Sequence, residues 1–372
     1  MEATRLTNRA LNRAVLARQL LLERQPLAVD EAIHRVGGLQ GQSPMWPFVG
    51  LWSRLAGFDR QALLDGLYER RVVKATLMRG TLHLVTAADY LAVYPGLWPH
   101  FQTYAARYRP DRAKFEGLTD LAASAMAFAA QPRPATEIRA HLVPRSPGID
   151  ALDVWWRVRF HSPFLHAPVP SATWGFDTRN HIVSAPAWLG ADVDNDEGAA
   201  SIGVRSLVEL HLGAFGPAAA ADIVRWSGLP VGTVRSAIAA VEPELVRYRD
   251  DEGGELLDLA GAPLPDPDTP APVRLLPMWD SVLLAYADGS RVITPQRRRA
   301  VVNRRGDVAP TFLVDGTVAG TWAVKIGKKD VTARVQPFGR LAKAARGELA
   351  AEAERLVALC APDAIRRRVT VD

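Results

Sequence analysis

The sequence predicts an α+β fold in which three tandem winged-helix modules precede a small C-terminal β-rich domain. Helical segments followed by a short two-stranded hairpin recur three times before residue 262, and three helices with a hairpin make a winged helix. Residues 262–272 hold five prolines in eleven positions, which excludes regular structure and marks a boundary. Strand-like segments dominate beyond it. A chain of 372 residues suits about two to four such units.

The first module is expected over residues 1–110. Apolar residues at helical spacing predict three helices, over 8–24, over 30–36 with Asp30 as N-cap, and over 59–71. Alternating apolar residues then predict a hairpin of strands 72–77 and 81–85 around the turn Met78-Arg79-Gly80.

The second and third modules are expected over residues 111–190 and 200–261. In the second, segments 134–143 and 151–160 read as helices, and 164–169 with 172–176 as strands. In the third, helices are expected over 201–215, over 218–226 before Gly228, and after Pro230, where Thr233 or the preceding turn provides the cap. Two strands then flank the turn Gly253-Gly254.

The C-terminal domain is expected over residues 273–372. Its strands are predicted within 274–286, within 311–324 around the turn Asp315-Gly316, and over 331–339. A final amphipathic helix is predicted over about 341–361.

Charge and composition are compatible with a polyanionic partner. The chain carries 45 Lys and Arg against 40 Asp and Glu, a net charge of +5, and only six of the basic residues are lysine. Arginine binds phosphate in bidentate fashion, although a high-GC genome would produce the same bias. The single cysteine, Cys360, excludes a disulfide framework, no histidines stand at HExxH spacing, and no apolar run approaches 18 residues. We therefore expect a cytoplasmic protein without metal, cofactor or membrane span.

The segment GLQGQSP, residues 38–44, is the first candidate site. Gly37 and Gly38 end a helix and Pro44 delays the next one, so residues 39–43 between them should be extended or turn-like. Residues i and i+2 of an extended segment share a side, so Gln40 and Gln42 can present two carboxamides together. Spacing alone equally fits two glutamines that only satisfy backbone groups near a helix end.

Four longer segments carry a family resemblance. GLQGQSPMWPFVGLWSRL, LMRGTLHLVTAADY, LLPMWDSVLLAYADGSRVI and LVDGTVAGTW resemble the AlkZ/YcaQ family of winged-helix DNA glycosylases. The resemblance implies winged helices arranged as a C-shaped, basic channel for DNA, and excision of N7-alkylated purines. The family's catalytic motif falls on Gln40, Gly41 and Gln42. Gln in the last place implies the AlkZ-like subclass, which unhooks interstrand crosslinks, while Gly41 departs from the usual aliphatic residue.

The chemistry expected of this motif is mild. A purine alkylated at N7 is already cationic and leaves without being protonated, so a strong general acid is not needed. Two preorganised carboxamides can place a water molecule and stabilise an oxocarbenium-like sugar. We expect Gln42 to position the water and Gln40 to support the water or the sugar, although these roles could be exchanged. No lysine lies in the motif, so the enzyme is expected to be monofunctional.

A basic segment, residues 290–306, is the second candidate. Its arginines are expected to bind DNA phosphates, and they are Arg291, Arg297, Arg298, Arg299, Arg304 and Arg305. A solvated basic loop is the alternative. The family resemblance implies a β-hairpin here that reaches into DNA.

Three further residues are weaker candidates. Arg79, in the first hairpin, is expected to contact phosphate, and His83 to lie beside the site or in the core. Asp280 could add a polar group to the cleft or simply form a turn. The tryptophans at 46, 155 and 156 could stack on bases, but helical spacing is more typical of core residues.

Two hypotheses of function follow. The first is monofunctional hydrolysis of the N-glycosidic bond of N7-alkylguanine in duplex DNA, including crosslinked DNA, by a monomer. The alternative is a winged-helix transcription regulator that binds an operator without catalysis, since a fold does not determine function.

Overall fold

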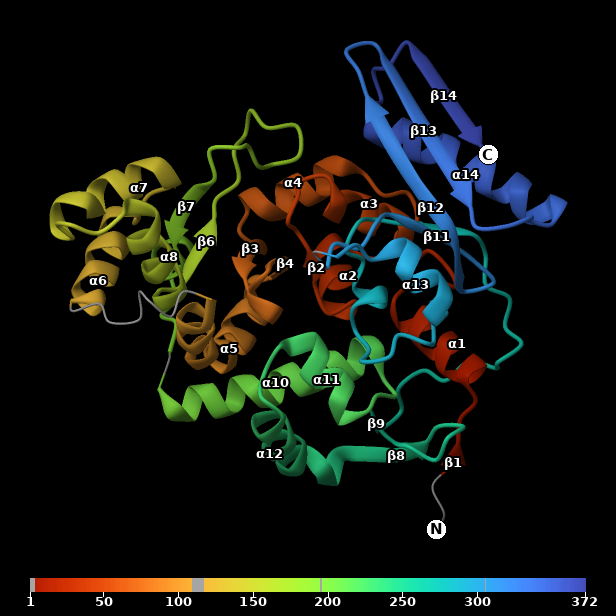
Figure 1. Cartoon of the computed structure of the whole chain (residues 1–372), viewed down its shortest axis with the longest axis horizontal. Helices are drawn as coiled ribbons and strands as arrows, with labels where there is room; N and C mark the ends of the chain where they lie inside the picture. The colour runs from red at the N-terminus through yellow and green to blue at the C-terminus, as the bar shows by residue number, and fades with distance from the viewer. Residues whose placement is uncertain (1–3, 109–116, 195, 305) are drawn as a thin grey trace.

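The computed structural model describes residues 4–108, 117–194, 196–304 and 306–372, and it has an α+β fold as predicted. The described strands form three sheets (Figure 1). A six-stranded sheet in the order β2-β4-β3-β6-β7-β5 lies between helices of the N-terminal half. A three-stranded sheet, β1-β8-β9, and a five-stranded sheet, β10 to β14 in sequence order, lie towards opposite ends of the molecule.

Helices and a hairpin build the N-terminal part: α1 (Asn8–Arg18), α2 (Val29–Arg35), α3 (Trp46–Arg54), α4 (Arg60–Tyr68), β3 (Val72–Thr76) and β4 (Leu82–Thr86). The predicted hairpin is confirmed, with a 3-10 turn, η1 (Met78–Gly80), between its strands. The helix predicted over 8–24 ends early because the backbone turns at Leu20, whose φ is 57°. Asp30 is not a cap, since α2 begins one residue earlier and Asp30 pairs with Arg71.

Helix α3 was not predicted. Pro44 precedes it and Pro47 lies inside it, and both argue against a helix in the sequence. Pro47 stands in the first turn, however, where the missing N–H has no partner to lose. The apolar face of α3 packs on the C-terminal sheet through Val49.

The second helical part joins the same central sheet. Its elements are α6 (Leu118–Phe128), β5 (Arg133–Pro134), α7 (Ala135–Leu142), η3 (Val143–Arg145), α8 (Ala151–His161), β6 (Phe164–His166), β7 (His181–Ser184) and α9 (Ala185–Leu189). The helices predicted at α7 and α8 are confirmed. The strand predicted over 172–176 is wrong: this segment is a turn with Gly175 at φ 74°, and Trp174 packs edge-on against Phe48. Strand β7 takes its place beside β6.

Two long helices cross at two glycines. These helices are α5 (Ala87–Tyr108), which was not predicted, and α10 (Glu197–Phe215), which was. A Cβ on Gly203 would lie 2.4 Å from the backbone nitrogen of Gly96, so only glycine permits the observed approach. This contact brings the third helical part against the first.

The third helical part agrees with the prediction in most respects. It continues with α11 (Ala220–Ser227), α12 (Val231–Val241), η4 (Glu242–Glu244), β8 (Leu245–Arg249) and β9 (Glu255–Leu259). Thr233 is not the cap of α12, because Pro230 occupies that position and the helix starts at Val231. Strand β1 (Thr4–Arg5), from the start of the chain, pairs in parallel with β8.

The C-terminal part combines a sheet with a long helix. Its elements are β10 (Arg274–Leu276), η5 (Ser281–Leu283), α13 (Pro295–Val301), β11 (Thr311–Val314), β12 (Thr317–Ile326), β13 (Asp330–Pro337), α14 (Lys343–Cys360) and β14 (Arg366–Val371). The strand predicted within 274–286 is only three residues long, because Pro277 follows it and Trp279 has a φ of 59°. Strand β14 was not predicted, and it pairs in parallel with β13.

Buried contacts tie the parts together. The ion pair of Arg18 with Asp258 joins α1 to β9 with both side chains 1% exposed. The proline-rich segment has no regular structure, as predicted, and its Pro263 and Thr269 carbonyls accept hydrogen bonds from Arg18 and Arg13. One hydrophobic core continues from helix α1 to strand β12. The division into tandem winged-helix modules, their boundaries and the C-shaped channel stay predictions.

The glycine crossing supports a prediction about stability. Gly203→Ala should lower the free energy of unfolding by about 2–3 kcal/mol, because the added methyl group would force α5 and α10 apart. Chemical denaturation measures this change. Gly232→Ala in α12 is the control, since a Cβ there meets no atom within 4 Å. Equal stability of the two variants would contradict the close crossing.

Candidate active site

The glutamine motif lies at one edge of the central sheet. Gly37 and Gly38 have φ values of 73° and 85°, and the Gly38 N–H donates to the Ile33 carbonyl, which ends α2. The chain then extends as β2 (Leu39–Gln40) and pairs with β4, where Gln40 lies opposite His83. The segment is thus extended at Leu39 and Gln40 and bends at Gln42 and Ser43, in agreement with the extended or turn-like conformation expected here.

The β3–β4 hairpin holds both carboxamides, through Arg79 of its turn and Leu82 at the start of β4. The Oε1 atom of Gln40 accepts a hydrogen bond from Arg79 at 3.0 Å, and Gln40 is 8% exposed. The Oε1 atom of Gln42 accepts from the backbone N–H of Leu82 at 2.7 Å, and Gln42 is exposed. Each oxygen keeps a second lone pair. One glutamine is thus fixed inside the protein, and the other lies at its surface.

Arg79 holds Gln40 from the turn of the β3–β4 hairpin. Its φ of 57° is unusual for a residue other than glycine, and the side chain also donates to the carbonyl of Trp226 in α11. Burial lowers the pKa of Arg79 to about 10, with a smaller effect from Arg225, so the side chain is charged at neutral pH. The sequence predicted a phosphate contact here. In the structure the guanidinium is bonded to Gln40 and to the Trp226 carbonyl, and the phosphate contact stays a prediction.

His83 is buried in the core, opposite Gln40 on the neighbouring strand β4. Its Nδ1 atom is 3.1 Å from the Thr81 carbonyl, and burial, with the nearby charge of Arg79, lowers the pKa of the imidazole to about 3. The ring is therefore neutral at neutral pH. A neutral imidazole cannot act as the general acid that protonates a leaving base beside the glutamines.

The packing around Gly41 explains its departure from the family pattern. A Cβ at this position would lie 2.7 Å from Cδ1 of Leu84 and 3.8 Å from Cε of Lys74. Leu84 therefore occupies the space that a larger residue would need, and Lys74 lies beside it. The Lys74 ammonium group is 4.3 Å from the centre of the Phe176 ring, and burial lowers the pKa of that ammonium to about 8. Sequence reasoning missed Lys74, although its place between the apolar residues of β3 was a signal of burial.

Asp280 belongs to a different part of the structure. Its carboxylate forms two hydrogen bonds, of 2.9 and 3.0 Å, with the guanidinium of Arg54, and it also caps the 3-10 turn through Val282. Both charged side chains are buried. Asp280 therefore links α3 to the C-terminal part and adds no free polar group to a cleft.

Residues 295–301 of the basic segment form helix α13, where the resemblance implied a hairpin, and Val302 directly after the helix makes a single antiparallel bridge with Val308. Thr294 caps α13 and Pro295 occupies its first turn, a combination that favours helix initiation. Arg291 is buried, where it donates to the Pro217 carbonyl and lies over the Tyr286 ring, so it is not a phosphate contact.

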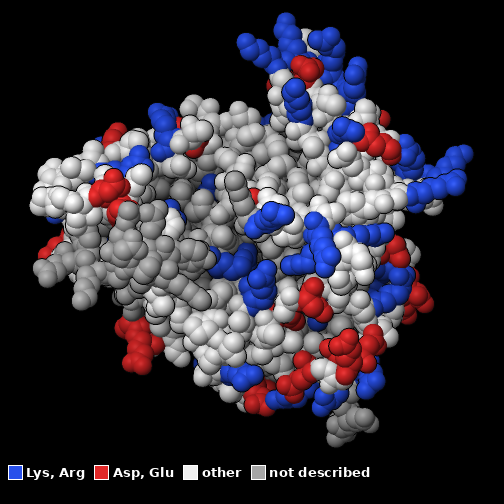
Figure 2. All heavy atoms as spheres, in the orientation of Figure 1, with Lys and Arg blue, Asp and Glu red and all other residues white. Residues whose placement is uncertain are grey.

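The other arginines of this segment differ in exposure. Arg297 is half-buried and donates to the Val318 carbonyl, and Arg298 is also half-buried. Arg299 and Arg304 are exposed, while Arg305 lies outside the described residues. Figure 2 shows basic side chains gathered around the position of α13 and acidic ones over the end of the molecule where β8 and β9 lie.

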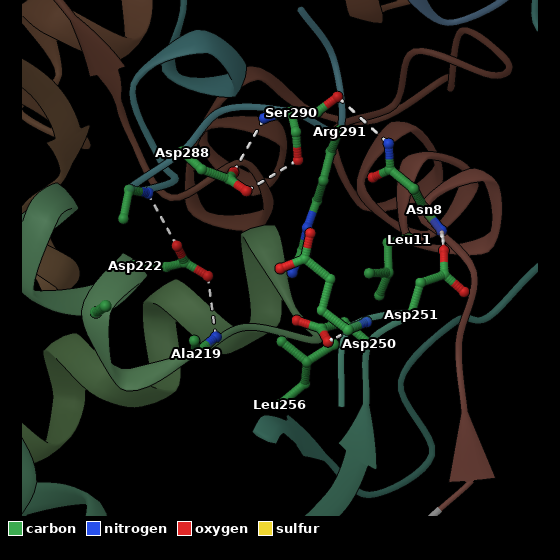
Figure 3. Close-up of a pocket in the computed structure, with 13 residues that line it drawn as sticks. Asn8, Leu11, Ala219, Asp222, Asp250, Asp251, Leu256, Asp288, Ser290 and Arg291 are labelled. Atoms are coloured by element: carbon green, nitrogen blue, oxygen red, sulfur yellow. Dashed lines mark hydrogen bonds between the residues drawn. The ribbon is translucent and has the colours of Figure 1, made fainter. Parts of the chain in front are cut away.

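A hollow of about 430 Å³ opens at that acidic end, between α1, α11 and the β8–β9 turn. Figure 3 shows that Asp250 and Asp251 line it together with Asp288. Their oxygens accept hydrogen bonds from nearby groups, such as the backbone N–H of Asn8 on Asp251. This hollow is separate from the glutamine motif and has the wrong charge for a phosphate.

Comparisons with known proteins now apply to this geometry. A family model described as DNA glycosylase AlkZ-like matches residues 33–359. The chain belongs to the AlkZ-like DNA glycosylase family. A curated relative, an interstrand DNA cross-link repair glycosylase from Streptomyces sahachiroi, is 25% identical over 83% of this chain and 85% of its own length. The solved structure of the Streptomyces sahachiroi DNA glycosylase AlkZ has a TM-score of 0.79, with 19% identity, 99% of this chain covered and 100% of the other.

These matches confirm the family resemblance seen in the sequence. The family is one of DNA glycosylases, and the structural likeness shows that this AlkZ-like chain has the same fold over its whole length. Nothing in the comparisons supports a transcription regulator. No helix in the described parts of this AlkZ-like chain has the length and apolar character needed to span a bilayer.

The low pKa of His83 supports a prediction about acid stability. Because its folded-state pKa of about 3 lies below the ordinary value, the unfolded chain takes up this proton first, and stability is lost as the pH falls below about 6.5. For this one residue the loss between pH 7 and pH 5 is about 2 kcal/mol. Urea denaturation at both pH values should show that His83→Leu removes this share of the loss.

Gln296→Leu, at an exposed position of α13, provides the control, since it removes no titratable group. Desolvation also lowers the pKa values of the half-buried His166 and the buried His211 to about 3, so part of the acid sensitivity remains in every variant. Equal pH dependence of wild type and His83→Leu would show that His83 takes up a proton in the folded protein.

Proposed function

We propose that this chain hydrolyses the N-glycosidic bond of N7-alkylated purines in duplex DNA, including purines in interstrand crosslinks. The observation that carries the proposal is the pair of neutral carboxamides that Gln40, on strand β2, and Gln42, in the bend after it, hold against the β3–β4 hairpin, with no acid among their described hydrogen-bond partners. The described partners of the two Oε1 atoms are Arg79 and the Leu82 amide, and His83 is neutral. Such a site suits a leaving base that already carries positive charge.

The proposed reaction uses water as the nucleophile. The free lone pair of the exposed Gln42 orients a water molecule, whose oxygen attacks C1′ of the sugar while the bond from C1′ to N9 breaks. The bonding electrons neutralise the cationic base, and the proton lost from the water passes to solvent. Gln40 supports the oxocarbenium-like sugar with a fixed dipole, because Arg79 prevents its rotation.

The proposed DNA path follows the basic face. Arg299 and Arg304 of the α13 region are exposed, which supports their proposed role as contacts to duplex phosphates. The Streptomyces sahachiroi relative is named for interstrand cross-link repair, and this supports crosslinked DNA as a substrate here. N7 faces the major groove, so a crosslinked base need not leave the stack completely.

The test of this function is base release from a defined lesion. Duplex DNA containing one N7-methylguanine, or a nitrogen-mustard crosslink, is incubated with the protein and treated with alkali, which cleaves abasic sites. The wild type should cut both substrates and should not act on unmodified guanine. No product from either substrate would contradict the proposal.

The glutamine variants test the site itself. Gln40→Ala and Gln42→Ala should each lower the single-turnover rate by about 100-fold, because each removes a preorganised dipole. Their affinity for DNA should stay within about twofold of the wild type, since neither side chain carries charge. The control is Gln61→Ala on the exposed surface of α4. Full activity in both motif variants would place the catalytic groups elsewhere.

A further inference from the structure

The free end of the C-terminal sheet carries a dense group of cations. Strand β12 turns into β13 there, and the parallel pairing of β14 with β13 places Arg366 opposite Asp330. We define the basic tip as six residues that are all exposed: Lys325, Lys328, Lys329, Arg366, Arg367 and Arg368. Figure 2 shows a projecting region rich in Lys and Arg at the end of the sheet labelled β12 to β14 in Figure 1.

These charges have little internal compensation. Within the described residues, no ion pair involves any member of the basic tip, and Arg367 donates only to the Pro362 carbonyl. Arg334, farther along β13, pairs instead with Asp372. Because like charges held this close repel one another, the basic tip is better suited to an anionic partner than to solvent alone.

The charge at the other end of the molecule indicates the direction of that partner. The hollow beside the β8–β9 turn is lined by Asp250, Asp251 and Asp288 (Figure 3) and repels phosphates. Strand β2, with the glutamine motif, lies between this acidic end and the basic tip in Figure 1. A duplex that occupies the motif is therefore drawn towards the C-terminal sheet.

We propose that the basic tip is a second DNA-binding site, which grips the phosphate backbone of the duplex that flanks the lesion. This inference rests on the proposed function only in taking duplex DNA as the substrate. The three arginines offer bidentate contacts to phosphate oxygens, and the three lysines act as point charges. Such contacts carry no base readout and add affinity for any sequence.

The test compares two charge-matched double variants. Lys328→Gln/Lys329→Gln removes two charges from the basic tip, and Arg35→Gln/Arg145→Gln removes two exposed charges elsewhere. Affinity for an undamaged 30-bp duplex is measured between 50 and 200 mM salt. The slope of log affinity against log salt should become shallower by about 1.8 in the tip variant, with binding at 100 mM roughly tenfold weaker. The control should match the wild type.

An excision assay distinguishes the second DNA-binding site from the proposed glycosylase function. At saturating DNA the tip variant should excise N7-methylguanine at the wild-type rate, since the basic tip does not contact the glutamines. If the wild type excises no base but the tip variant still has a shallower salt slope, the proposed function is contradicted and the second DNA-binding site is not. A salt slope equal to that of the wild type would overturn the second DNA-binding site.

A second double variant and a vesicle-binding assay complete the test. Arg366→Gln/Arg368→Gln should repeat the loss of affinity, and thermal melting verifies that each variant is folded. Ile365, next to the basic tip, is 74% exposed, so an anionic membrane is the competing partner. Unchanged DNA binding together with lost sedimentation on phosphatidylglycerol vesicles would assign the basic tip to lipid and overturn the proposal.

Discussion

The guanidinium of Arg79 is the contact on which the candidate site depends. It joins Gln40 of the edge strand β2 to the Trp226 carbonyl of α11, so residues that lie far apart in the chain meet at one side chain. The approach is possible because Gly228 has no Cβ, which would lie 3.1 Å from the Cα of Arg79. Hydrogen bonds in so buried a setting are stronger than in water and hold one geometry. The position of Gln40 is thus fixed by the third helical part as well as by its own strand.

The site combines the neutral groups of Gln40, Gln42 and His83 with the positive charges of Arg79 and Lys74. Burial keeps His83 neutral and lowers the pKa of Lys74 to about 8, while Arg79 stays charged and engaged. Neutral carboxamides can act on a substrate that brings its own positive charge, but they offer no proton to an uncharged base. The family is one of DNA glycosylases, and the proposal of a cationic base as substrate rests on the absence of an acid among the described partners of the glutamines.

Local signals in the sequence predicted the elements that local forces determine. The glycines at 37 and 38 indicated the helix end before the motif, and Met78-Arg79-Gly80 indicated the hairpin turn, as observed. Such local signals do not predict contacts between residues that are far apart in the sequence. The partner of Asp280 is Arg54, 226 positions away, and Arg79 binds a backbone carbonyl that has no sequence signature. Residues 172–176 look like a strand because they are aromatic, yet they pack as a turn against α4. The sequence of the basic segment shows its positive charge, but it does not show that Arg291 is buried.

A double-mutant cycle on the single-turnover excision rate tests most directly whether Arg79 acts through Gln40. The rates of Arg79→Met, Gln40→Ala and the double variant are compared with wild type on an N7-methylguanine duplex, with Arg225→Met as the control for the loss of a nearby exposed charge. The account predicts that Arg79→Met lowers the rate on its own and has almost no further effect once Gln40 is alanine. Full additivity of the two losses would contradict it, because Arg79 would then act independently of the glutamine it binds.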